Sequence, residues 1–441
     1  MAMVVKNNIP AKNTLNQADK NDKALAKSLK KLSSGMKINS AADDASGFSI
    51  SEKMRVQVRG LEQDIDNAQT GVSMMKVAEG GLQSTIDILS TLKEKVINAA
   101  NDTNTDADRA TIQKELNQAV DQLDDNANVQ YNGKTMLDGS RNNYVKNPGT
   151  YTSLANESLY EGTNGSDRIT SLRDFAGRSL GISSDSTIEF SYVLQGETYT
   201  TTLAVGSNIL TNMFSRSVDD KGVRPSQSII KMEFTANVGK DRVGDTVTTV
   251  NGNKALVFSA GQPGLDGQIS GLTINVINKD GTINRTANAV LNNFTEAVQA
   301  ENESPDNALV YQVGTKANQA VKIGFSDMRS VALGLKATNG DVLSIATQKK
   351  ANAAISVLEL AMEKALKLQT TIGAMESRMD FTVANLTTSS ENTQATESVI
   401  RDADMAKEMT GYTKNNVLMQ ASQSMLAQAN QSSSSVLSLL Q

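Results

Sequence analysis

One segment offers the spacing of a metal site: Asp102-Thr-Asn104-Thr-Asp106 copies the opening of a calcium-binding loop. The EF-hand loop also needs glycine at its sixth position and a bidentate glutamate at its twelfth. Ala107 and Gln113 occupy those positions here, so the ligand set is incomplete. The segment is therefore predicted to be a helix-capping loop, and no metal is expected.

The other carboxylate and glycine clusters do not indicate catalysis either. Asp121, Asp124 and Asp125 fall on the polar face of an expected helix, without an apolar pocket to raise a carboxyl pKa. The glycine-rich stretch 261–271 lacks the lysine of a phosphate-binding loop and the glycine spacing of a dinucleotide site. The chain is predicted not to be an enzyme and to need no cofactor.

Histidine and cysteine are both absent from the 441 residues. Their absence excludes a Cys/His zinc site, a Ser-His-Asp triad, a thiol nucleophile and the two-histidine metalloprotease signature. It also excludes disulfides, so the covalent form would be the same on either side of an oxidising boundary.

Charge and hydropathy argue against two kinds of partner. Residues 6–37 carry eight lysines but no aromatic residue, whereas nucleic-acid binding favours basic residues interleaved with stacking side chains. We interpret the lysines as a solvated helix face and expect no nucleic acid. No stretch approaches the roughly 20 apolar residues that span a bilayer, so no membrane is expected. Residues 1–6 lack the apolar region of a secretory signal, which favours the cytosol unless a dedicated route exports the chain.

The elements that organise the chain are long helices near its two ends. Apolar residues recur every three or four positions from about 44 to 100 and from 351 to 379, which is typical of helices packed along narrow seams. Such distant helices can pair only if the residues between them are looped out from one side. The seam positions are Ile50, Met54, Leu61 and Ile65 in the first stretch, and Leu358, Met362 and Ile372 in the second.

Shorter amphipathic helices are predicted at the extreme ends, over 12–33 and about 404–440. Gly35 should end the first, because glycine suits the left-handed position after a helix. Their apolar faces are too thin to hold isolated helices in water. These faces comprise Leu15, Leu25, Leu29 and Leu32 in the first helix, and Leu418, Met425, Leu426, Val436, Leu437, Leu439 and Leu440 in the last.

The middle of the chain has a different composition. Fourteen of the seventeen Phe and Tyr residues lie within 131–344, and twenty of the thirty glycines lie between 141 and 340. Alternating patterns predict a hairpin over 187–203, further strands, and a helix over 287–300. The predicted fold is mainly α, a long coiled helical bundle (rod) built from both termini, with an inserted α+β, strand-rich region.

Two features bear on the continuity of the long helices. The Gly80-Gly81 pair would break the first helix unless packing compensates, since each glycine costs up to ~1 kcal/mol against alanine. A run of Thr, Ser, Asn and Gln over 387–396 is predicted to interrupt the second helix, which otherwise runs from about 341 to 386.

Two signatures stand at opposite ends of the chain. The first is Leu32-Ser-Ser-Gly-Met-Lys-Ile-Asn-Ser-Ala-Ala-Asp-Asp-Ala-Ser-Gly47, and the second includes Ile400-Arg-Asp-Ala-Asp404 and Leu426-Ala-Gln-Ala-Asn-Gln431. They resemble the N- and C-terminal signatures of bacterial flagellins, and the resemblance covers about 1–140 and 340–441. The middle carries no such likeness.

The resemblance implies a structural subunit that polymerises into the extracellular flagellar filament after export without a cleaved signal peptide. The implied partners are further copies of the chain in a helical homopolymer, the flagellar cap and hook-junction proteins, and an export chaperone on the C-terminal helix. We expect the terminal helices to be disordered in the monomer and helical in the polymer. The implied domains are 1–43 and 404–441 (inner tube), 44–140 and 341–403 (wall), and 141–340 (outer surface).

Two alternatives and one further partner remain. One alternative is a hook–filament junction protein, which has related termini, and the other is an adhesin displayed on flagellin-like ends. Resemblance to flagellins that activate a host toll-like receptor implies that Glu94 and Glu115 face the receptor. Thr91 replaces an arginine of that pattern and Lys95 replaces a leucine, so activation is expected to be weak.

Overall fold

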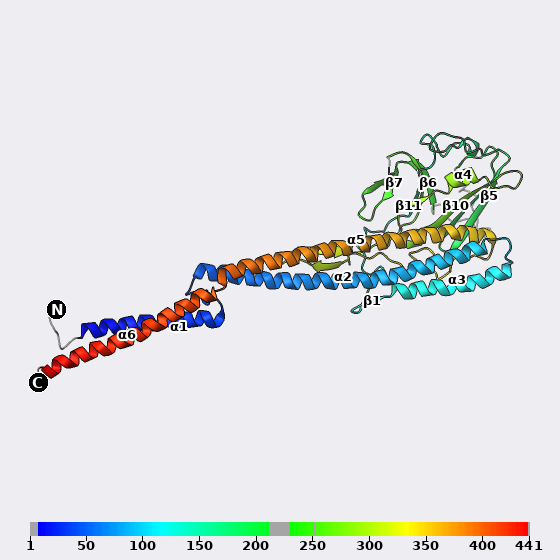
Figure 1. Ribbon diagram of the computed structural model, residues 1–441. Helices are drawn as coiled ribbons and strands as arrows, with labels where there is room; N and C mark the ends of the chain where they lie inside the picture. The colour runs from blue at the N-terminus through cyan, green and yellow to red at the C-terminus, as the bar shows by residue number, and fades with distance from the viewer. Residues whose placement is uncertain (1–7, 211–229, 251, 440–441) are drawn as a thin grey trace. The chain divides into compact units, whose positions relative to one another are not determined.

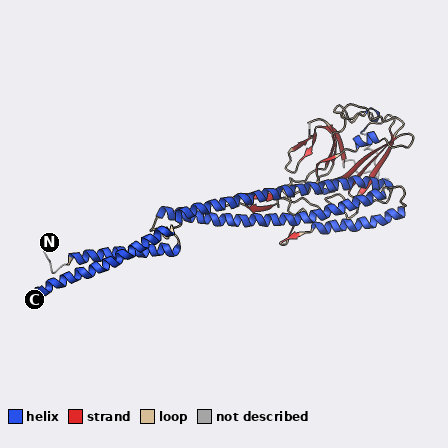
Figure 2. Ribbon diagram, in the orientation of Figure 1, coloured by secondary structure: helices blue, strands red, loops and turns tan. Residues whose placement is uncertain are grey.

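The computed structural model describes residues 8–210, 230–250 and 252–439. Helices come from both ends of the chain and strands from its middle (Figures 1 and 2). The mainly α class with a strand-rich insert is therefore confirmed. The helices are α1 (Ile9–Ser34), α2 (Ala45–Ala99), α3 (Asp106–Ala127), α4 (Arg285–Leu291), α5 (Gln348–Arg401) and α6 (Met405–Leu439).

The chain divides into two compact units, and α2 and α5 each pass through both of them. One unit combines residues 1–68, 312–319 and 381–441, and the other combines 69–311 and 320–380. The first unit therefore holds both chain ends, and the second holds α3 and the strands, except that the last residue of β12 (Leu309–Gln312) falls in the first. The three domains expected from the sequence remain a prediction.

In the second unit α2 packs antiparallel against both α3 and α5. Lys93 of α2 forms an ion pair with Glu359 of α5 at 3.0 Å, and farther along the Gln369 amide donates to the Gln83 side chain at 3.0 Å. On the other side, Lys95 pairs with Glu115 of α3 at 2.9 Å. Between these polar borders lie fully buried residues that include Met75, Leu82, Leu89, Val96, Leu116, Val120, Leu123, Leu358 and Ala361.

The helix starts follow the local sequence. The Asp44 carboxylate accepts the backbone N–H groups of Ser46 and Gly47, each at 3.0 Å, and so caps α2. Thr105 and Asp108 form a complete capping box at the start of α3. The calcium-like segment is thus a capping loop, as predicted, and Gly35 takes the left-handed conformation after α1 (φ 69°).

Helix α2 continues through Gly80 and Gly81 without a break. At Gly81 the absence of a side chain lets the segment after α3 pack close to the helix backbone. A Cβ on Gly81 would meet Val129 Cγ2 at 3.1 Å and Leu137 Cδ1 at 3.3 Å, whereas a Cβ on Gly80 would meet nothing within 4 Å. The segment that follows α3 therefore packs directly on the α2 backbone at Gly81. Packing compensates for the glycine cost, and the helix does not break.

Helix α5 differs from its prediction at both ends. It begins at Gln348 rather than near 341, because the preceding segment is held by α3: the Ile345 N–H donates to the Gln113 side chain at 2.7 Å. The polar run over 387–396 does not interrupt it. Thr388 and Thr396 donate their hydroxyls to the carbonyls four residues earlier, at 3.0 and 2.7 Å, so these side chains are satisfied inside the helix.

The middle contains antiparallel sheets. Among the described residues, a three-stranded sheet has the order β10-β4-β5, a four-stranded sheet has the order β11-β3-β9-β6, and there are three two-stranded ribbons. The predicted hairpin is β4–β5, turning at Gln195 (φ 52°) and Gly196 (φ 71°). The strands are β1 (Gln130–Tyr131), β2 (Lys134–Thr135), β3 (Ser153–Asn156), β4 (Thr187–Leu194), β5 (Glu197–Ala204), β6 (Ile230–Thr235), β7 (Asn237–Lys240), β8 (Thr246–Thr248), β9 (Ala255–Ala260), β10 (Ile269–Ile277), β11 (Thr295–Val298), β12 (Leu309–Gln312) and β13 (Ala320–Ile323).

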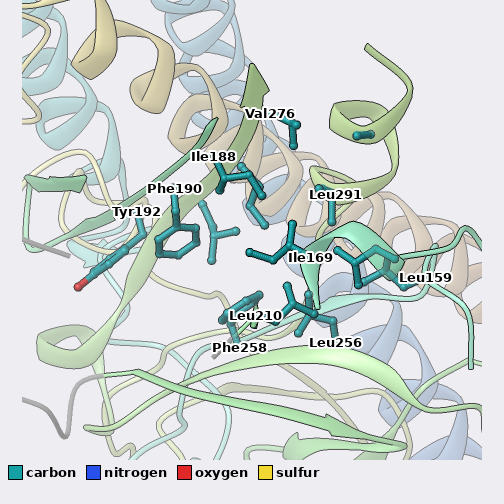
Figure 3. Packing of buried hydrophobic residues seen from close by; sticks show 14 of the residues in the cluster. Leu159, Ile169, Ile188, Phe190, Tyr192, Leu210, Leu256, Phe258, Val276 and Leu291 are labelled. Carbon is teal, nitrogen blue, oxygen red and sulfur yellow. The ribbon is translucent and has the colours of Figure 1, made fainter. Parts of the chain in front are cut away.

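The two larger sheets share one aromatic core (Figure 3). Phe190 from β4 stacks on Phe258 from β9, with ring centroids 6.3 Å apart. Phe258 also meets Phe294 edge-on at 5.4 Å. These contacts give the middle a hydrophobic core whose buried members all come from residues 154–291.

The helix predicted over 287–300 is wrong in its second half. Helix α4 ends at Leu291, and residues 295–298 form β11 instead. The Asn292 side chain accepts the N–H of Ile274 at 2.6 Å and donates to its carbonyl at 2.7 Å. This side chain ties the end of the helix to β10, and the following residues pair with β3.

A buried ion pair joins the strands to α5. Glu296 on β11 and Lys364 on α5 lie 3.3 Å apart, with side chains only 3% and 7% exposed. Burial raises the pKa of Glu296, and the Lys364 ammonium opposes that shift. Breaking such a pair leaves an uncompensated buried charge, so the pair fixes where the insert docks on α5.

The adjacent glycines of α2 provide a matched pair of substitutions. Gly80→Ala should raise the free energy of unfolding by up to ~1 kcal/mol, because alanine is the better helix former and meets no neighbour. Gly81→Ala should raise the free energy of unfolding by less, or should lower it, because Val129 and Leu137 must move to make room for the added methyl group. Urea unfolding monitored by circular dichroism compares them. Equal stabilisation by both substitutions would contradict the close packing at Gly81.

Candidate assembly surfaces at the chain ends

Helices α1 and α6 pair antiparallel through polar side chains. Asn21 donates to the Ser422 hydroxyl at 2.8 Å and to the Leu418 carbonyl at 3.2 Å. Asn415 donates to Ser28 at 3.3 Å. Asn21 and Ser28 are the buried residues of α1. The helices therefore meet along a polar seam, defined by Asn21, Ser28, Asn415 and Ser422.

Several of the larger apolar side chains lie outside this seam. On α1, Leu15 is 48% exposed and Leu29 is 54% exposed, while Leu25 and Leu32 are half-buried. An isolated water-soluble pair would gain by burying such residues between its helices. Here they remain available to a further partner, as do five residues of α6: Met405, Met409, Val417, Leu418 and Met425.

A clip around Arg401 holds the point where α5 passes into α6. The Arg401 side chain is only 8% exposed. Its Nη1 donates a hydrogen bond to the Glu52 carboxylate at 2.6 Å. The guanidinium carbon Cζ lies 5.6 Å from the centroid of the Phe48 ring. The backbone closes the clip, since the Lys37 N–H donates to the Arg401 carbonyl at 2.7 Å and the Ala403 N–H to the Gly35 carbonyl at 2.9 Å. One arginine thus joins the start of α2 to the end of α5.

The loop between α1 and α2 is fixed by Asp43. Its carboxylate pairs with Lys27 of α1 at 3.1 Å and accepts from the Asn39 N–H and the Ser40 hydroxyl, each at 3.2 Å. The Lys27 hydrogen bond is the largest cause that lowers the Asp43 pKa to about 2. This contact stabilises the loop above the ordinary carboxyl pKa of 3.8 and is lost as the pH falls through about 2.

The predicted seam residues divide by depth of burial. Leu61, Leu358 and Ile372 are buried. Met54, Ile65 and Met362 are half-buried, as is Leu426 on α6, whereas Ile50 is 43% exposed. The side chains of Val436, Leu437, Leu439 and Leu440 lie outside the described residues.

The predicted receptor-facing residues lie on neighbouring helices. Glu94 on α2 is exposed. Glu115 on α3 is held by Lys95, whose ammonium lies 2.9 Å from its carboxylate. Lys95 therefore binds one of the two glutamates directly.

Sequence reasoning missed the polar seam and the clip. Asn21 and Ser28 stand seven residues apart, as do Asn415 and Ser422. That heptad spacing was a readable signal, but a search for apolar repeats passes over small polar residues. Arg401 was visible only as part of the Ile400–Asp404 motif, because its partners Phe48 and Glu52 lie some 350 residues away in the sequence.

The described residues hold no cluster of three or more His, Cys, Asp or Glu side chains that could bind a metal. Among their helices, none combines the length and apolarity needed to cross a membrane. What the two chain ends do offer is exposed apolar surface on helices whose most buried mutual contacts are polar.

Comparison with known families matches both ends of the chain. The family model for the bacterial flagellin N-terminal helical region matches residues 5–142, and the model for the C-terminal helical region matches 355–440. Flagellin of Clostridium tyrobutyricum is 33% identical over 430 residues, covering 97% of this chain and 99% of that protein. Flagellin of Bacillus subtilis (strain 168) is 28% identical, covering 99% and 100%. The flagellar filament 31.3 kDa core protein of Treponema maltophilum is also 28% identical, covering 100% of both chains.

Removing the Arg401 guanidinium should destabilise the fold by an amount that depends on pH. The Arg401 hydrogen bond is the main cause that lowers the Glu52 pKa below its ordinary 4.5, so the pair stabilises the fold above that value and loses its effect as the pH falls through the lowered pKa. Arg401→Met should therefore lower the urea midpoint of unfolding more at about pH 7 than at about pH 2. Arg401→Lys, which keeps the charge, is the control. A midpoint loss that is equal at both pH values would mean that Arg401 acts through packing alone.

Proposed function

The chain belongs to the bacterial flagellin family, and on this premise we propose how its two ends build a filament. It is a structural subunit of the flagellar filament. We propose that the α1–α6 pair binds further copies of the chain through the apolar side chains outside its polar seam. A contact between two different surfaces that does not close into a ring grows a helical polymer.

The exposure of Leu29 and Met409 carries this proposal. These side chains are 54% and 51% exposed on helices whose own contacts are polar. Burying a leucine or methionine fully contributes about 1.5–3 kcal/mol. Several such residues per subunit would supply the driving force of assembly, while the polar seam sets the register of the pair.

The parts of α2 and α5 in the same unit offer a second contact surface. Val56 on α2 is 60% exposed, and Phe381 and Val399 on α5 are 71% and 78% exposed. Contact with another copy of the chain would remove these apolar side chains from water. We propose that these residues contact neighbouring copies in the wall of the filament, around an inner tube formed by 1–43 and 404–441.

Ordering of α1 and α6 is proposed to accompany assembly. Fixing a residue costs about 1–2 kcal/mol of backbone entropy, and a polar seam returns little hydrophobic free energy. Neighbouring subunits would supply the missing burial. Growth would then be restricted to the filament tip, where already ordered subunits provide a template.

Other flagellar partners are proposed on the same surface. An export chaperone on α6 would cover Met405 and Met409 before assembly, and the cap and hook-junction proteins would meet the same apolar faces at the two ends of the filament. We further propose export without a cleaved signal peptide. The chaperone role predicts that a chain lacking residues 405–441 no longer retains the chaperone in a pull-down.

Removing the exposed apolar side chains should block assembly without unfolding the monomer. Leu29→Ser combined with Met409→Ser should raise the critical concentration for polymerisation at least tenfold, because a tenfold change needs only about 1.4 kcal/mol. Sedimentation of monomers seeded with filament fragments measures it. Lys23→Ser combined with Lys30→Ser, at exposed positions of α1, is the matched control. Unchanged polymerisation of the double apolar variant would contradict the proposal.

The insert should be dispensable for polymerisation. Val145 and Ser304 form an antiparallel bridge, with N–H to carbonyl distances of 3.0 and 3.2 Å in the two directions, so a two-residue Asn-Gly turn can join them. Replacing residues 146–303 by this turn removes both larger sheets and keeps all of α1, α2, α3, α5 and α6. We expect thinner filaments by electron microscopy. If the shortened chain is helical but does not polymerise, contacts made by the insert are essential for assembly and the prediction is wrong.

Weak activation of the host toll-like receptor is also proposed. Interface energy concentrates in a few residues, and loss of an arginine anchor can cost 2 kcal/mol or more, roughly thirtyfold in affinity. The Lys95–Glu115 ion pair supports the proposal, because it engages a carboxylate expected to face the receptor. Thr91→Arg with Lys95→Leu should raise monomer potency in a receptor reporter assay, and unchanged potency would refute it.

A further inference from the structure

The insert carries a surface cleft whose lining includes none of the residues assigned above to assembly. The cleft has a volume of about 480 Å³, within the usual range for small-molecule sites. It lies between the residues after β3, a tight turn over 174–178, and the residues just before β9. Leu159 lines it and belongs to the aromatic core of the sheets (Figure 3). Its base is therefore fixed by the fold.

Phe175 stands on one wall of this cleft and is 60% exposed. The turn that carries it is rigid: the Asp174 carboxylate accepts the Arg178 N–H and its Nε–H, both at 2.8 Å. The Phe175 N–H donates to the Ser158 carbonyl at 2.9 Å. These hydrogen bonds hold the Phe175 ring at the cleft, where its exposed face is available to stack on a ligand.

The opposite wall is also ordered. The Glu157 carboxylate accepts the Val250 N–H at 3.0 Å, and the Thr249 hydroxyl donates to the Asn253 carbonyl at 2.7 Å. Asn253 and Lys254 line the cleft from this side. Because both walls are held by hydrogen bonds, a ligand would bind without the cost of ordering them.

The chemistry of the lining selects one class of ligand. Three carboxylates (Glu157, Glu161, Asp174) face two cations (Arg178, Lys254), so the cleft has no positive excess to favour an anion. One ring is too little apolar surface for a purely hydrophobic ligand. A sugar ring presents an apolar C–H face together with hydroxyl groups that both donate and accept hydrogen bonds, and carboxylate, amide and ammonium groups satisfy such hydroxyls.

We propose that this cleft binds an uncharged saccharide, with the sugar C–H face against Phe175 and its hydroxyls bonded to Glu161, Asn253 and Lys254. A filament repeats the cleft along its length. Weak single sites would therefore add up on a surface that carries many copies of the sugar, where multivalency strengthens binding by 10²–10⁴-fold.

Monomer and filament can be tested separately. Each is applied to beads that carry glucose, galactose, mannose or N-acetylglucosamine, with sulfated galactose and uncoupled beads for comparison. We expect retention on at least one uncharged sugar, and filament retention at least a hundredfold stronger than monomer retention. Titration of the monomer with that free sugar should show at least tenfold weaker binding for Phe175→Ala.

The control is Tyr144→Ala, which removes an exposed aromatic ring outside the cleft and should bind the sugar as the parent chain does. Both variants should polymerise normally, which separates this proposal from the assembly proposal. Retention on sulfated galactose alone, no retention on any uncharged sugar, or undiminished binding by Phe175→Ala would overturn the saccharide site.

Discussion

A helix has a limited circumference, so the face that α1 gives to α6 cannot also be given to another subunit. The chain places small polar residues on that shared face: Asn21 and Ser28 meet Ser422 and Asn415 through hydrogen bonds. Larger apolar side chains such as Leu29 stay in water. An apolar seam in its place would make the pair more stable alone and leave less surface for assembly. The polar seam is therefore the constraint on which the assembly account depends.

Within each of the two units, a further contact fixes one element on a long helix. Arg401 links the first turns of α2 to the last turn of α5, and Lys364 fixes β11 on α5 from within a buried environment. The insert brings its own aromatic core, and its ends meet at the Val145–Ser304 bridge. Because the chain enters and leaves this region at paired residues between α3 and α5, the region forms a surface of its own, which suits it to the proposed saccharide binding.

Much of this architecture could be predicted from the sequence because it rests on local rules. The seam periodicity, the Thr105–Asp108 capping box and the Gln195–Gly196 turn all follow from residues close together in the chain. The errors arose where distant contacts decide. Asn292 ends α4 by bonding to β10, and Gln113 of α3 holds the segment before α5 out of the helix. The Arg401 clip depends on partners in the N-terminal part of the chain, which no local pattern reveals.

Amide hydrogen exchange of monomer and filament tests most directly whether the chain ends are completed by neighbouring copies. The account predicts that amides of α1 and α6 exchange at least ~10³-fold faster in the monomer than in the filament, because their burial comes from other subunits. Amides of α2 between residues 74 and 96, where Met75 and Val96 are fully buried within the chain, should be protected in both states. Equal protection of α1 and α6 in monomer and filament would contradict the account.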